Sequence, residues 1–395
     1  MRATRQVMGG LGQALISLLA PSARLYPADR KVPRLALLDG SRGLAAVGVL
    51  FFHYRHFFYP PGVFRSPDIA GRAPLEGLFW PLYELGHFGV QLFWMISGFV
   101  FAAVYYGRSA TSREFVVNRF ARLYPLHFAT LLVVAAEQGA ACLRFGTPLL
   151  FEHNDGLHFL MQLGFASNWF GTAMSFNGPI WSVSVEVVLY AVFWLTRRWL
   201  PALGVAGPLA LACAMTVLRR ELGGTDVWPC GFHFFLGVTL CSAWRSFAAM
   251  PRLLLAAGLA AMALAGAGLL RIDPRETEII GVVLLPLLLG GFILTLVAAE
   301  PFAPAWLRRP LAALGDRTYA MYLVHVPVQL LLFLVLGPRI AALAEKPWFL
   351  ALFMALVIGL AWPCYRWFEA PAREWLRRYA RPARPVGPAV LAHGG

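Results

Sequence analysis

An arginine and a histidine stand with ten residues between them in the apolar stretch LDGSRGLAAVGVLFFHY. In an α-helix, the eleven steps from Arg42 to His53 turn the chain through about 1100°, which is three turns plus about 20°. The two side chains are therefore predicted to share one helix face, about 16 Å apart along its axis. Histidine is the usual general base near neutral pH. Taken alone, Arg42 could equally anchor the helix at an interface, and His53 could be a hydrogen-bonded core residue.

Three further stretches place polar side chains within or beside apolar runs. In NRFARLYP, Arg119 and Arg122 lie on one helix face, where paired guanidinium groups suit phosphates. In NGPIWSVSVEVVLY, Glu186 lies inside an apolar run, and a buried carboxylate needs a partner. In LGDRTYAMYLVHVP, three side chains at three-residue spacing share one side of the helix, namely Tyr319, Tyr322 and His325. The plainer alternatives are positive charge at the end of a span, a local ion pair and aromatic core packing.

The elements that must position these side chains are predicted to be membrane-spanning helices. Of the 395 residues, 59% are hydrophobic and 14% are charged, whereas a soluble domain averages about 45–50% and about 25%. A span needs roughly 20 mostly apolar residues. The sequence therefore predicts an all-α polytopic membrane protein of about ten transmembrane helices, with apolar runs near 43–59, 88–106, 123–143, 180–196, 203–218, 229–245, 252–270, 279–299, 315–336 and 347–367.

The basic residues predict which loops face the cytoplasm. The net charge is +14, but the arginines occupy short loops rather than one face of a soluble domain. This favours the positive-inside rule over nucleic-acid binding. The short apolar stretch 157–170 decides the topology, because a full crossing would place the basic loops around Arg197 and Arg308 outside. We therefore predict a re-entrant segment near 157–170 that lines a cavity, with both termini cytoplasmic.

The chain divides into three predicted parts. Residues 1–34 form a cytoplasmic amino-terminal segment, 35–372 the transmembrane domain, and 373–395 an Arg-, Pro- and Ala-rich cytoplasmic tail that is expected to be disordered. Residues 1–23 also fit a cleaved signal peptide, which would invert the topology, or an interfacial amphipathic helix. The five cysteines have no metal-ligand spacing, so no metal site is predicted.

In combination, these stretches resemble the membrane-bound acyltransferase-3 family of O-acyltransferases. The similarity runs from LDGSRGLAAVGVLFFHY through GVQLFWMISGFVF, NRFARLYP, NGPIWSVSVEVVLY and LGDRTYAMYLVHVP to YRWFEAP, over residues 35 to about 375. It implies an enzyme of the bacterial inner membrane that moves an acyl group, often acetyl, from cytoplasmic acyl-CoA to a hydroxyl of a carbohydrate or glycolipid acceptor.

The resemblance also implies roles for individual residues. His53 would activate the acceptor or the acyl-transfer step, Arg42 would support it or bind the donor, and Glu186 matches a functionally important carboxylate. Arg119 and Arg122 would bind the phosphates of CoA. The residues expected to line the acceptor site or cavity are Tyr319, Tyr322, His325, Trp181 and Asn177.

The expected partners follow from this reaction. Acyl-CoA is the co-substrate, and no permanently bound cofactor or metal is expected. Membrane lipids and a glycan acceptor are expected partners, and nucleic acid is not. Many members of the family carry a soluble hydrolase-like domain at the carboxyl end, and this sequence has none, so the chain is expected to act alone or with a separate soluble partner.

Several points stay open at the level of sequence. Direct attack of the acceptor is preferred over an acyl-His53 intermediate. The predicted outer loop 60–87, with Asp68, Glu76, Glu84 and His87, is where acceptor selectivity is expected. A transporter of an anionic or lipid-linked sugar intermediate is the alternative from another class, because membrane arginines and a carboxylate suit it equally. Such transporters often contain inverted repeats, and none is visible. A third alternative is a structural subunit of an envelope complex, which would not need His53.

Overall fold

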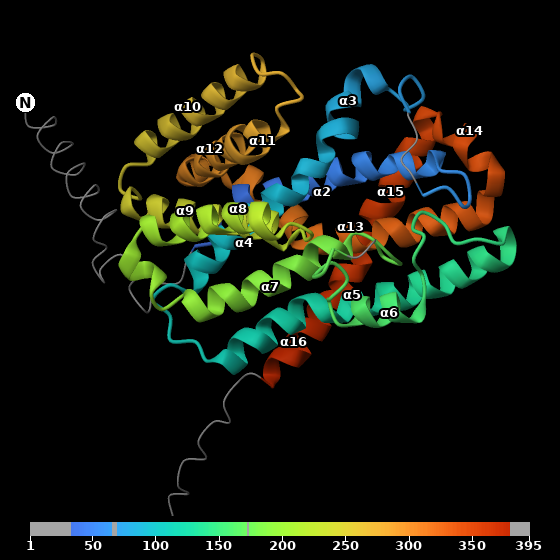
Figure 1. The fold of residues 1–395 in the computed structure, drawn as a ribbon, viewed down its shortest axis with the longest axis horizontal. Helices are drawn as coiled ribbons and strands as arrows, with labels where there is room; N and C mark the ends of the chain where they lie inside the picture. The colour runs from blue at the N-terminus through green and yellow to red at the C-terminus, as the bar shows by residue number, and fades with distance from the viewer. Residues whose placement is uncertain (1–32, 65–68, 172–173, 380–395) are drawn as a thin grey trace, which may run out of the picture.

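The computed structural model describes residues 33–64, 69–171 and 174–379, and every regular element within them is helical (Figure 1). The helices are α2 (Ala36–His53), α3 (Glu76–Leu85), α4 (Gly89–Tyr105), α5 (Ser112–Phe145), α6 (Gly156–Leu163), α7 (Ile180–Thr196), α8 (Ala206–Leu222), α9 (Val227–Ser246), α10 (Pro251–Leu269), α11 (Thr277–Ile279), α12 (Leu285–Ala299), α13 (Ala305–Leu336), α14 (Ile340–Ala344), α15 (Pro347–Pro363) and α16 (Ala370–Arg378). The predicted amino-terminal segment, with its signal-peptide alternative, lies almost entirely outside the described residues.

The prediction of an all-α polytopic membrane protein is confirmed. Within the described ranges, seven helical segments are long and apolar enough to cross a membrane, counting helices that run directly into one another as one. Each of the ten predicted apolar runs falls on a helix. The helices α2, α7 and α8 are not among the seven, so a total of ten spans stays a prediction.

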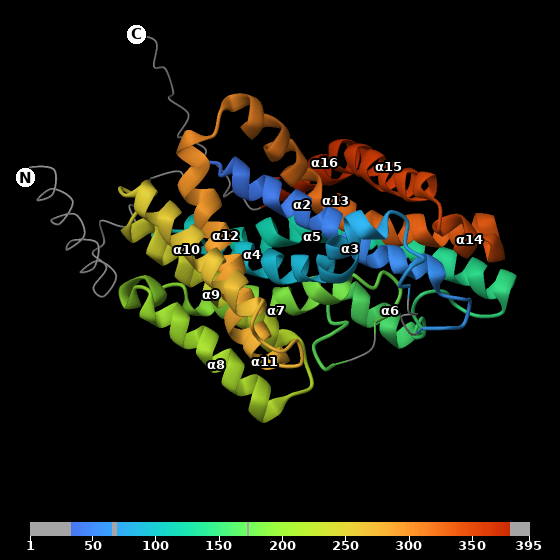
Figure 2. The same cartoon turned by 90° about the horizontal axis from the view of Figure 1, so that it is seen from above.

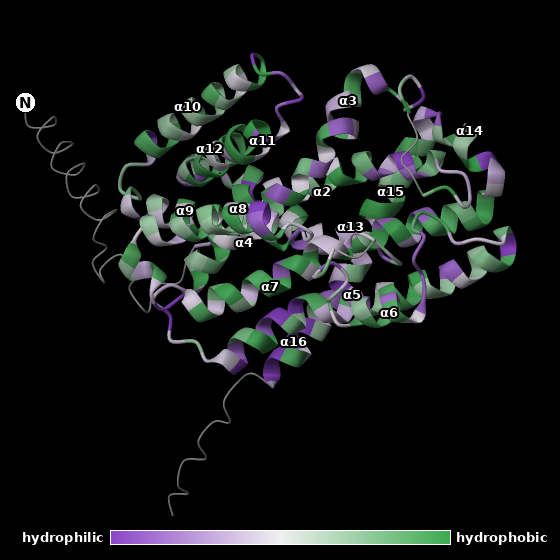
Figure 3. Cartoon of the chain, in the orientation of Figure 1, coloured by the Kyte–Doolittle hydropathy of each residue, from purple (hydrophilic) through white to green (hydrophobic). Residues whose placement is uncertain are grey.

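The surface has the character expected of a chain surrounded by lipid. Apolar residues extend along the long helices, and hydrophilic residues gather at helix ends, on α16 and in loops (Figure 3). On α10 only Leu254, Gly258 and Ala265 are buried, although the helix is strongly apolar. In water this exposed apolar surface would be costly, whereas lipid tails solvate it.

The helix α13 lies at the centre of the part that carries the candidate site. It packs against α2, α5 and α15, while α4 pairs with α9 and α10 pairs with α12. The α10–α12 pair occupies one end of the molecule and α14 the other (Figure 2). Because α2 and α13 pack together, residues from the first and fourth sequence motifs can meet although they are far apart in the chain.

Glycines allow the closest helix contact in this core. A side-chain carbon on Gly98 of α4 would lie 1.8 Å from the carbonyl oxygen of Phe234, and one on Gly237 of α9 would lie 1.8 Å from that of Met95. Such distances are impossible for non-bonded atoms, so α4 and α9 can pack in this way only with glycine at both positions. Close packing on small residues is how membrane helices gain contact where lipid weakens the hydrophobic effect.

Local sequence fixes where α5 begins, and with it the positions of Arg119 and Arg122. The Thr111 hydroxyl accepts from the Glu114 N–H at 3.1 Å, and the Glu114 carboxylate accepts from the Thr111 N–H at 2.9 Å. This capping box starts the helix at Ser112. The helix then continues through Pro125, where the sequence had placed the start of a span, and it ends at Gly146 with a φ of 73°.

Two helix boundaries differ from expectation. The helix α2 begins at Ala36, seven residues before the predicted apolar run at 43–59, and Asp39 lies in its first turn. The Asp39 carboxylate binds the Arg34 guanidinium at 2.9 Å, and Arg34 also binds Asp316 of α13 at 2.8 Å. At the other end, α16 continues past the predicted boundary at residue 372, and the tail from residue 380 lies outside the described residues.

The segment between α5 and α7 is too short in helical structure to cross a membrane as a helix. Its one helix, α6, has eight residues and is therefore about 12 Å long, far short of the roughly 30 Å of a hydrocarbon core. Residues just after α5, among them Phe151 and His153, line the same cavity as Pro179 just before α7. No residue of the predicted segment 157–170 is among those lining this cavity, so a re-entrant segment there stays a prediction.

Candidate functional site

Two cavities lie at different levels along α2. The histidine-lined cavity has a volume of about 390 Å³ and is lined by His53, His56 and Arg55. The arginine-lined cavity has a volume of about 340 Å³ and contains Arg42 and Glu186. Because Arg42 and His53 are eleven residues apart on one helix, these two lining residues lie about 16 Å apart along its axis.

The arginine-lined cavity brings together every arginine that the sequence singled out. Arg42 enters from α2, and Arg119 and Arg122 enter from α5. Arg34 and Arg377, which sequence analysis did not predict, also line it. Three carboxylates share the wall, and two of them, Asp39 and Asp316, are already paired with Arg34. The cavity therefore carries a surplus of guanidinium groups, which suits an anionic ligand.

The guanidinium groups of this cavity are only partly satisfied by the protein. Arg119 stacks over the Phe101 ring at 4.7 Å, and its terminal nitrogen donates to the Tyr105 hydroxyl at 3.5 Å. Its Nε is buried without a hydrogen-bond partner, as is the Nε of Arg377. Guanidinium groups with unsatisfied donors beside a cavity are one feature expected of a phosphate site.

Glu186 is a carboxylate in the same cavity, and its negative charge has polar and cationic neighbours. Its side chain is hydrogen-bonded to Ser97 and Tyr190 and is attracted by Arg42 and Arg119. Ser97 belongs to GVQLFWMISGFVF on α4, so residues of three other sequence motifs surround this carboxylate. Glu186 thus adds a negative charge close to the cationic side chains of α2 and α5.

His53 and His325 form a direct contact that fixes the protons on both rings. The Nδ1 of His325 lies 2.7 Å from the Tyr322 carbonyl oxygen and must donate to it, since a carbonyl only accepts. In the neutral ring, Nε2 of His325 is then an acceptor, and it lies 2.8 Å from Nδ1 of His53. His53 therefore carries its proton on Nδ1. Its Nε2 keeps a free lone pair, as a general base requires.

Gln329 forms hydrogen bonds with the turn of the chain that carries His53 and His56. The Gln329 side-chain nitrogen donates to the His53 carbonyl oxygen at 2.8 Å, while its oxygen accepts from Nδ1 of His56 at 3.1 Å. The rings of His53 and His56 stack with centroids 4.9 Å apart. His325 and Gln329 are both fully buried and lie one helical turn apart on α13. Together they fix the orientation of His53 at the end of α2.

A tyrosine links the walls of the two cavities. Tyr322 lines the arginine-lined cavity, and Pro179 lines the histidine-lined cavity. The Tyr322 hydroxyl donates to the Pro179 carbonyl at 2.9 Å and contacts the Ser182 hydroxyl at 2.8 Å. The Tyr322 side chain thus joins the wall of one cavity to the wall of the other.

Tyr319, Asn177 and Trp181 were also predicted to line the acceptor site or cavity, and they lie in three different environments. Tyr319 lines the arginine-lined cavity and donates to the Leu123 carbonyl at 2.8 Å. Asn177 is fully buried and donates to Thr130 and to the Leu323 carbonyl, which ties α5 to α13. Trp181 packs edge-on against Trp94 and lines neither cavity. The last two are therefore placed as packing residues.

The predicted outer loop contributes little to the cavity walls. Among its described residues, Phe64 lines the histidine-lined cavity, whereas Glu76, Glu84 and His87 do not. Glu84 instead forms an ion pair with Arg55 at 3.2 Å. Asp68 lies outside the described residues. The segment before α7 supplies more of the wall, through Leu150, Phe151, Glu152, His153 and Met174.

Comparisons with known proteins match most of this chain. Residues 35–366 match a protein-family model described as an acyltransferase domain. Acyltransferase MdmB of Streptomyces mycarofaciens is 26% identical over 340 residues, which cover 75% of this chain and 80% of the relative. Exopolysaccharide production protein ExoZ of Rhizobium meliloti is 28% identical over 305 residues, covering 73% and 90%. Protein 2 in the picA locus of Rhizobium radiobacter is 32% identical over 186 residues, covering 42% and 82%. No solved structure matches.

Proposed function

The chain belongs to the acyltransferase-3 family of membrane acyltransferases, and we propose that it moves an acetyl group from cytoplasmic acetyl-CoA to a hydroxyl of a carbohydrate or glycolipid. The observation that carries this proposal is the His53–His325 contact, which leaves His53 with a free Nε2 in the histidine-lined cavity. The same helix carries Arg42 into the arginine-lined cavity. One helix thus links a base to a site suited to an anionic donor.

The donor is assigned to the arginine-lined cavity by its charge. Coenzyme A carries a 3′-phosphate and a pyrophosphate, and guanidinium groups bind such oxygens through paired hydrogen bonds. Arg42, Arg119 and Arg122 supply these groups, and Arg377 adds one from α16. The thioester must then extend along α2 by about 16 Å and pass Tyr322 to reach His53.

The acceptor is assigned to the histidine-lined cavity. Its wall combines aromatic side chains, such as Tyr59 and Phe151, with polar groups from Arg55 and Glu152. A largely apolar cavity with a few polar groups that fix orientation is typical of small-molecule sites. A relative named for exopolysaccharide production supports a sugar acceptor.

The chemistry proposed for this geometry is a direct transfer. The acceptor oxygen attacks the thioester carbonyl while Nε2 of His53 takes its proton, since the alkoxide is too basic to form unaided. A C–O bond forms, the C–S bond then breaks, and the leaving CoA sulfur takes the proton back from Nε2. His53 ends the cycle neutral, and no covalent enzyme intermediate is required.

The proposed orientation places the arginine-lined cavity at the cytoplasmic face of the inner membrane, with both termini cytoplasmic. The basic loops around Arg113, Arg197 and Arg308 then all lie inside, in agreement with the positive-inside rule. The histidine-lined cavity opens toward the outer face, where surface glycans are assembled.

The function is tested by comparing cells with and without the gene. Mass spectrometry of their surface polysaccharides and glycolipids should find a species heavier by one acyl group only when the gene is present. Complementation with the wild-type gene should restore this species. Identical glycan profiles in the two strains would count against the proposed acceptor class.

The arginine pair on α5 is expected to govern donor affinity. Replacing Arg119 or Arg122 with glutamine should raise KM for acetyl-CoA by about tenfold or more, because each removes a charge-assisted hydrogen bond. The variant that has lost its contact with the 3′-phosphate should no longer distinguish acetyl-CoA from 3′-dephospho-acetyl-CoA. Steady-state kinetics with both donors measures this.

The matched control for that experiment is Arg309→Gln. Arg309 is exposed and lines neither cavity, so this change removes the same charge from the same predicted face of the membrane. Its KM for acetyl-CoA should stay close to the wild-type value. Equal KM values in the α5 variants and in this control would exclude the arginine-lined cavity as the donor site.

The proposed orientation is tested by cysteine labelling. In a background whose five free cysteines are replaced, Arg308→Cys should react with a membrane-impermeant maleimide only after the cells are opened. Gly77→Cys, in an exposed turn of α3 with open space around it, should react in intact cells. Labelling of residue 308 in intact cells would invert the proposed orientation.

A further inference from the structure

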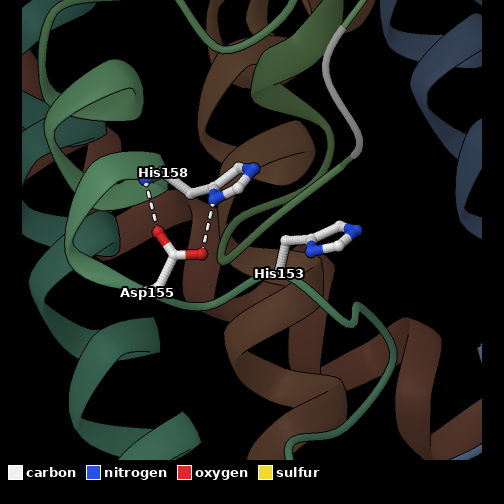
Figure 4. A group of neighbouring side chains, drawn as sticks. All are labelled: His153, Asp155 and His158. Carbon is white, nitrogen blue, oxygen red and sulfur yellow. Dashed lines mark hydrogen bonds and ion pairs between the residues drawn. The ribbon is translucent and has the colours of Figure 1, made fainter.

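A cluster of metal-type ligands lies beside the histidine-lined cavity and has no place in the proposed transfer chemistry. It consists of His153, Asp155 and His158 (Figure 4). One ring nitrogen from each histidine and one carboxylate oxygen all lie within 4.8 Å of one another. We propose that these three residues form a binding site for a divalent transition metal, with Zn²⁺ as the best match. The site does not depend on the proposed function.

The ligand types select the class of metal. Two imidazoles and one carboxylate suit Zn²⁺, whereas Ca²⁺ and Mg²⁺ prefer oxygen ligands alone. Three protein ligands leave the fourth tetrahedral position open to water or to another oxygen ligand. Zn–N bonds of about 2.0–2.1 Å place ligand atoms about 3.3 Å apart, so the cluster must close by about 1.5 Å. His153 is partly exposed, and its ring makes no hydrogen bond within the described residues, so it can rotate to do this.

The backbone that carries these ligands is held in place independently of any metal. The Asn154 side chain donates to the Phe151 carbonyl at 2.6 Å and accepts from the Phe176 N–H at 2.7 Å, which fixes the loop at both sides. Asp155 caps α6 by accepting from the His158 N–H at 3.0 Å. A ligand set on a fixed loop and a capped helix loses little freedom when it binds an ion.

The side chains are also oriented toward one another. The Asp155 carboxylate pairs with Nδ1 of His158 at 2.8 Å, and the rings of His153 and His158 lie nearly parallel with centroids 5.1 Å apart. Figure 4 shows the His153 ring below that of His158, with the Asp155 carboxylate beside both. An ion bound between the three would replace the hydrogen bond from His158 and give His153 a partner.

The position of the cluster indicates what a bound ion would influence. His153 and the preceding Glu152 line the histidine-lined cavity together with His53. A metal held by His153 therefore lies at the wall of that cavity and not at the arginine-lined cavity. If the proposed function is right, removal of the metal should alter KM for the acceptor and leave KM for acetyl-CoA unchanged.

The metal site is tested on the full-length protein, purified in detergent without a polyhistidine tag and stripped with a chelator. Equilibrium dialysis against Zn²⁺ should leave one ion per chain, and Co²⁺ should give the visible absorption of a low-coordinate site. His153→Ala and His158→Ala should each weaken Zn²⁺ binding by at least about tenfold. His87→Ala, which removes a histidine outside the cluster, should bind Zn²⁺ like the wild type.

A fourth variant separates loss of the ligand from loss of the helix cap. Asn caps a helix as well as Asp does, so Asp155→Asn should keep α6 intact while it removes the anionic ligand, and Zn²⁺ affinity should still fall. Zinc should raise the thermal midpoint of the wild type and not that of His153→Ala. The proposal is overturned if the wild type shows no saturable Zn²⁺ binding, or if the His153 and His158 variants bind Zn²⁺ as tightly as the wild type.

Discussion

Replacing His53 with alanine is expected to lower kcat/KM for acyl transfer by about 10²- to 10⁴-fold, the usual contribution of a general base. The lone pair on Nε2 of His53 is kept available by the hydrogen bond that Nδ1, on the other side of the same ring, donates to His325. Without it, the acceptor hydroxyl must attack the thioester unassisted. Acetyl-CoA should still bind, because its site lies about 16 Å away along α2.

The control for this variant is Leu44→Ala. Leu44 is on the same helix but its side chain is 60% exposed, so its loss tests whether α2 tolerates truncation without touching either cavity. Acyl transfer should remain near the wild-type rate in that control. Residual transfer by His53→Ala at the wild-type rate, in protein that elutes as a single folded species, would show that His53 is not the base.

Replacing His325 with leucine is expected to cost between about 10²- and 10⁴-fold in kcat, although His325 lines neither cavity. Leucine cannot accept the proton on Nδ1 of His53, so the His53 ring is free to carry its proton on Nε2 and to rotate. In the Ser-His-Asp template, loss of the group that fixes the histidine tautomer costs about 10⁴ in kcat. His325 acts through His53, so it is a positioning residue, and KM for acetyl-CoA should change little.

His325→Gln distinguishes positioning from simple packing. The glutamine side-chain oxygen can accept the Nδ1 proton that Nε2 of His325 accepts in the wild type, so this variant should recover much of the activity that leucine loses. A purely structural role for His325 predicts similar losses in both variants, together with a lower thermal midpoint. Equal activity in the two variants would refute the proposal that the hydrogen bonds from the Tyr322 carbonyl through His325 fix the proton of His53 on Nδ1.

Features that arise within one helix could be predicted from the sequence. The shared face of Arg42 and His53 follows from helix geometry alone, and the predicted apolar runs fall on α2, α5, α7 and α13, although α2, α5 and α13 begin seven to eleven residues earlier than predicted. The arginine pair on α5 was identified by its three-residue spacing. Arginines in alternating loops predicted which loops face the cytoplasm, because cytoplasmic loops of membrane proteins carry an excess of Lys and Arg.

Features that depend on contacts between distant helices could not be predicted in this way. His53 and His325 are 272 residues apart, and Gln329 reaches the His53 carbonyl across 276 residues. Their proximity follows from the packing of α2 on α13, which no local pattern encodes. Arg377 was assigned to a disordered tail, because α16 is stabilised by its contact with α5 and is too short and polar to be recognised alone.

Helix packing also determined the surroundings of individual residues, which residue type and spacing could not predict. Glu369 was not among the predicted site residues, yet it is buried and both of its carboxylate oxygens lack a hydrogen-bond donor. It is attracted by Arg122, Arg373 and Arg42 instead. Trp181 belongs to the Trp-Ser segment but faces Trp94. Residue type and spacing indicate which side chains could act, and helix packing decides which of them face a cavity.

The most direct test is acyl transfer across membrane vesicles. Inverted vesicles from a deletion strain that expresses the protein are given acetyl-CoA labelled in its acetyl group, with the strain's own surface glycans and glycolipids as the acceptor pool. The proposed function predicts ester-linked label on glycan or glycolipid in wild-type vesicles, and none above the deletion background with His53→Ala. Equal ester-linked label in wild-type and His53→Ala vesicles, or no label above background in either, would contradict it.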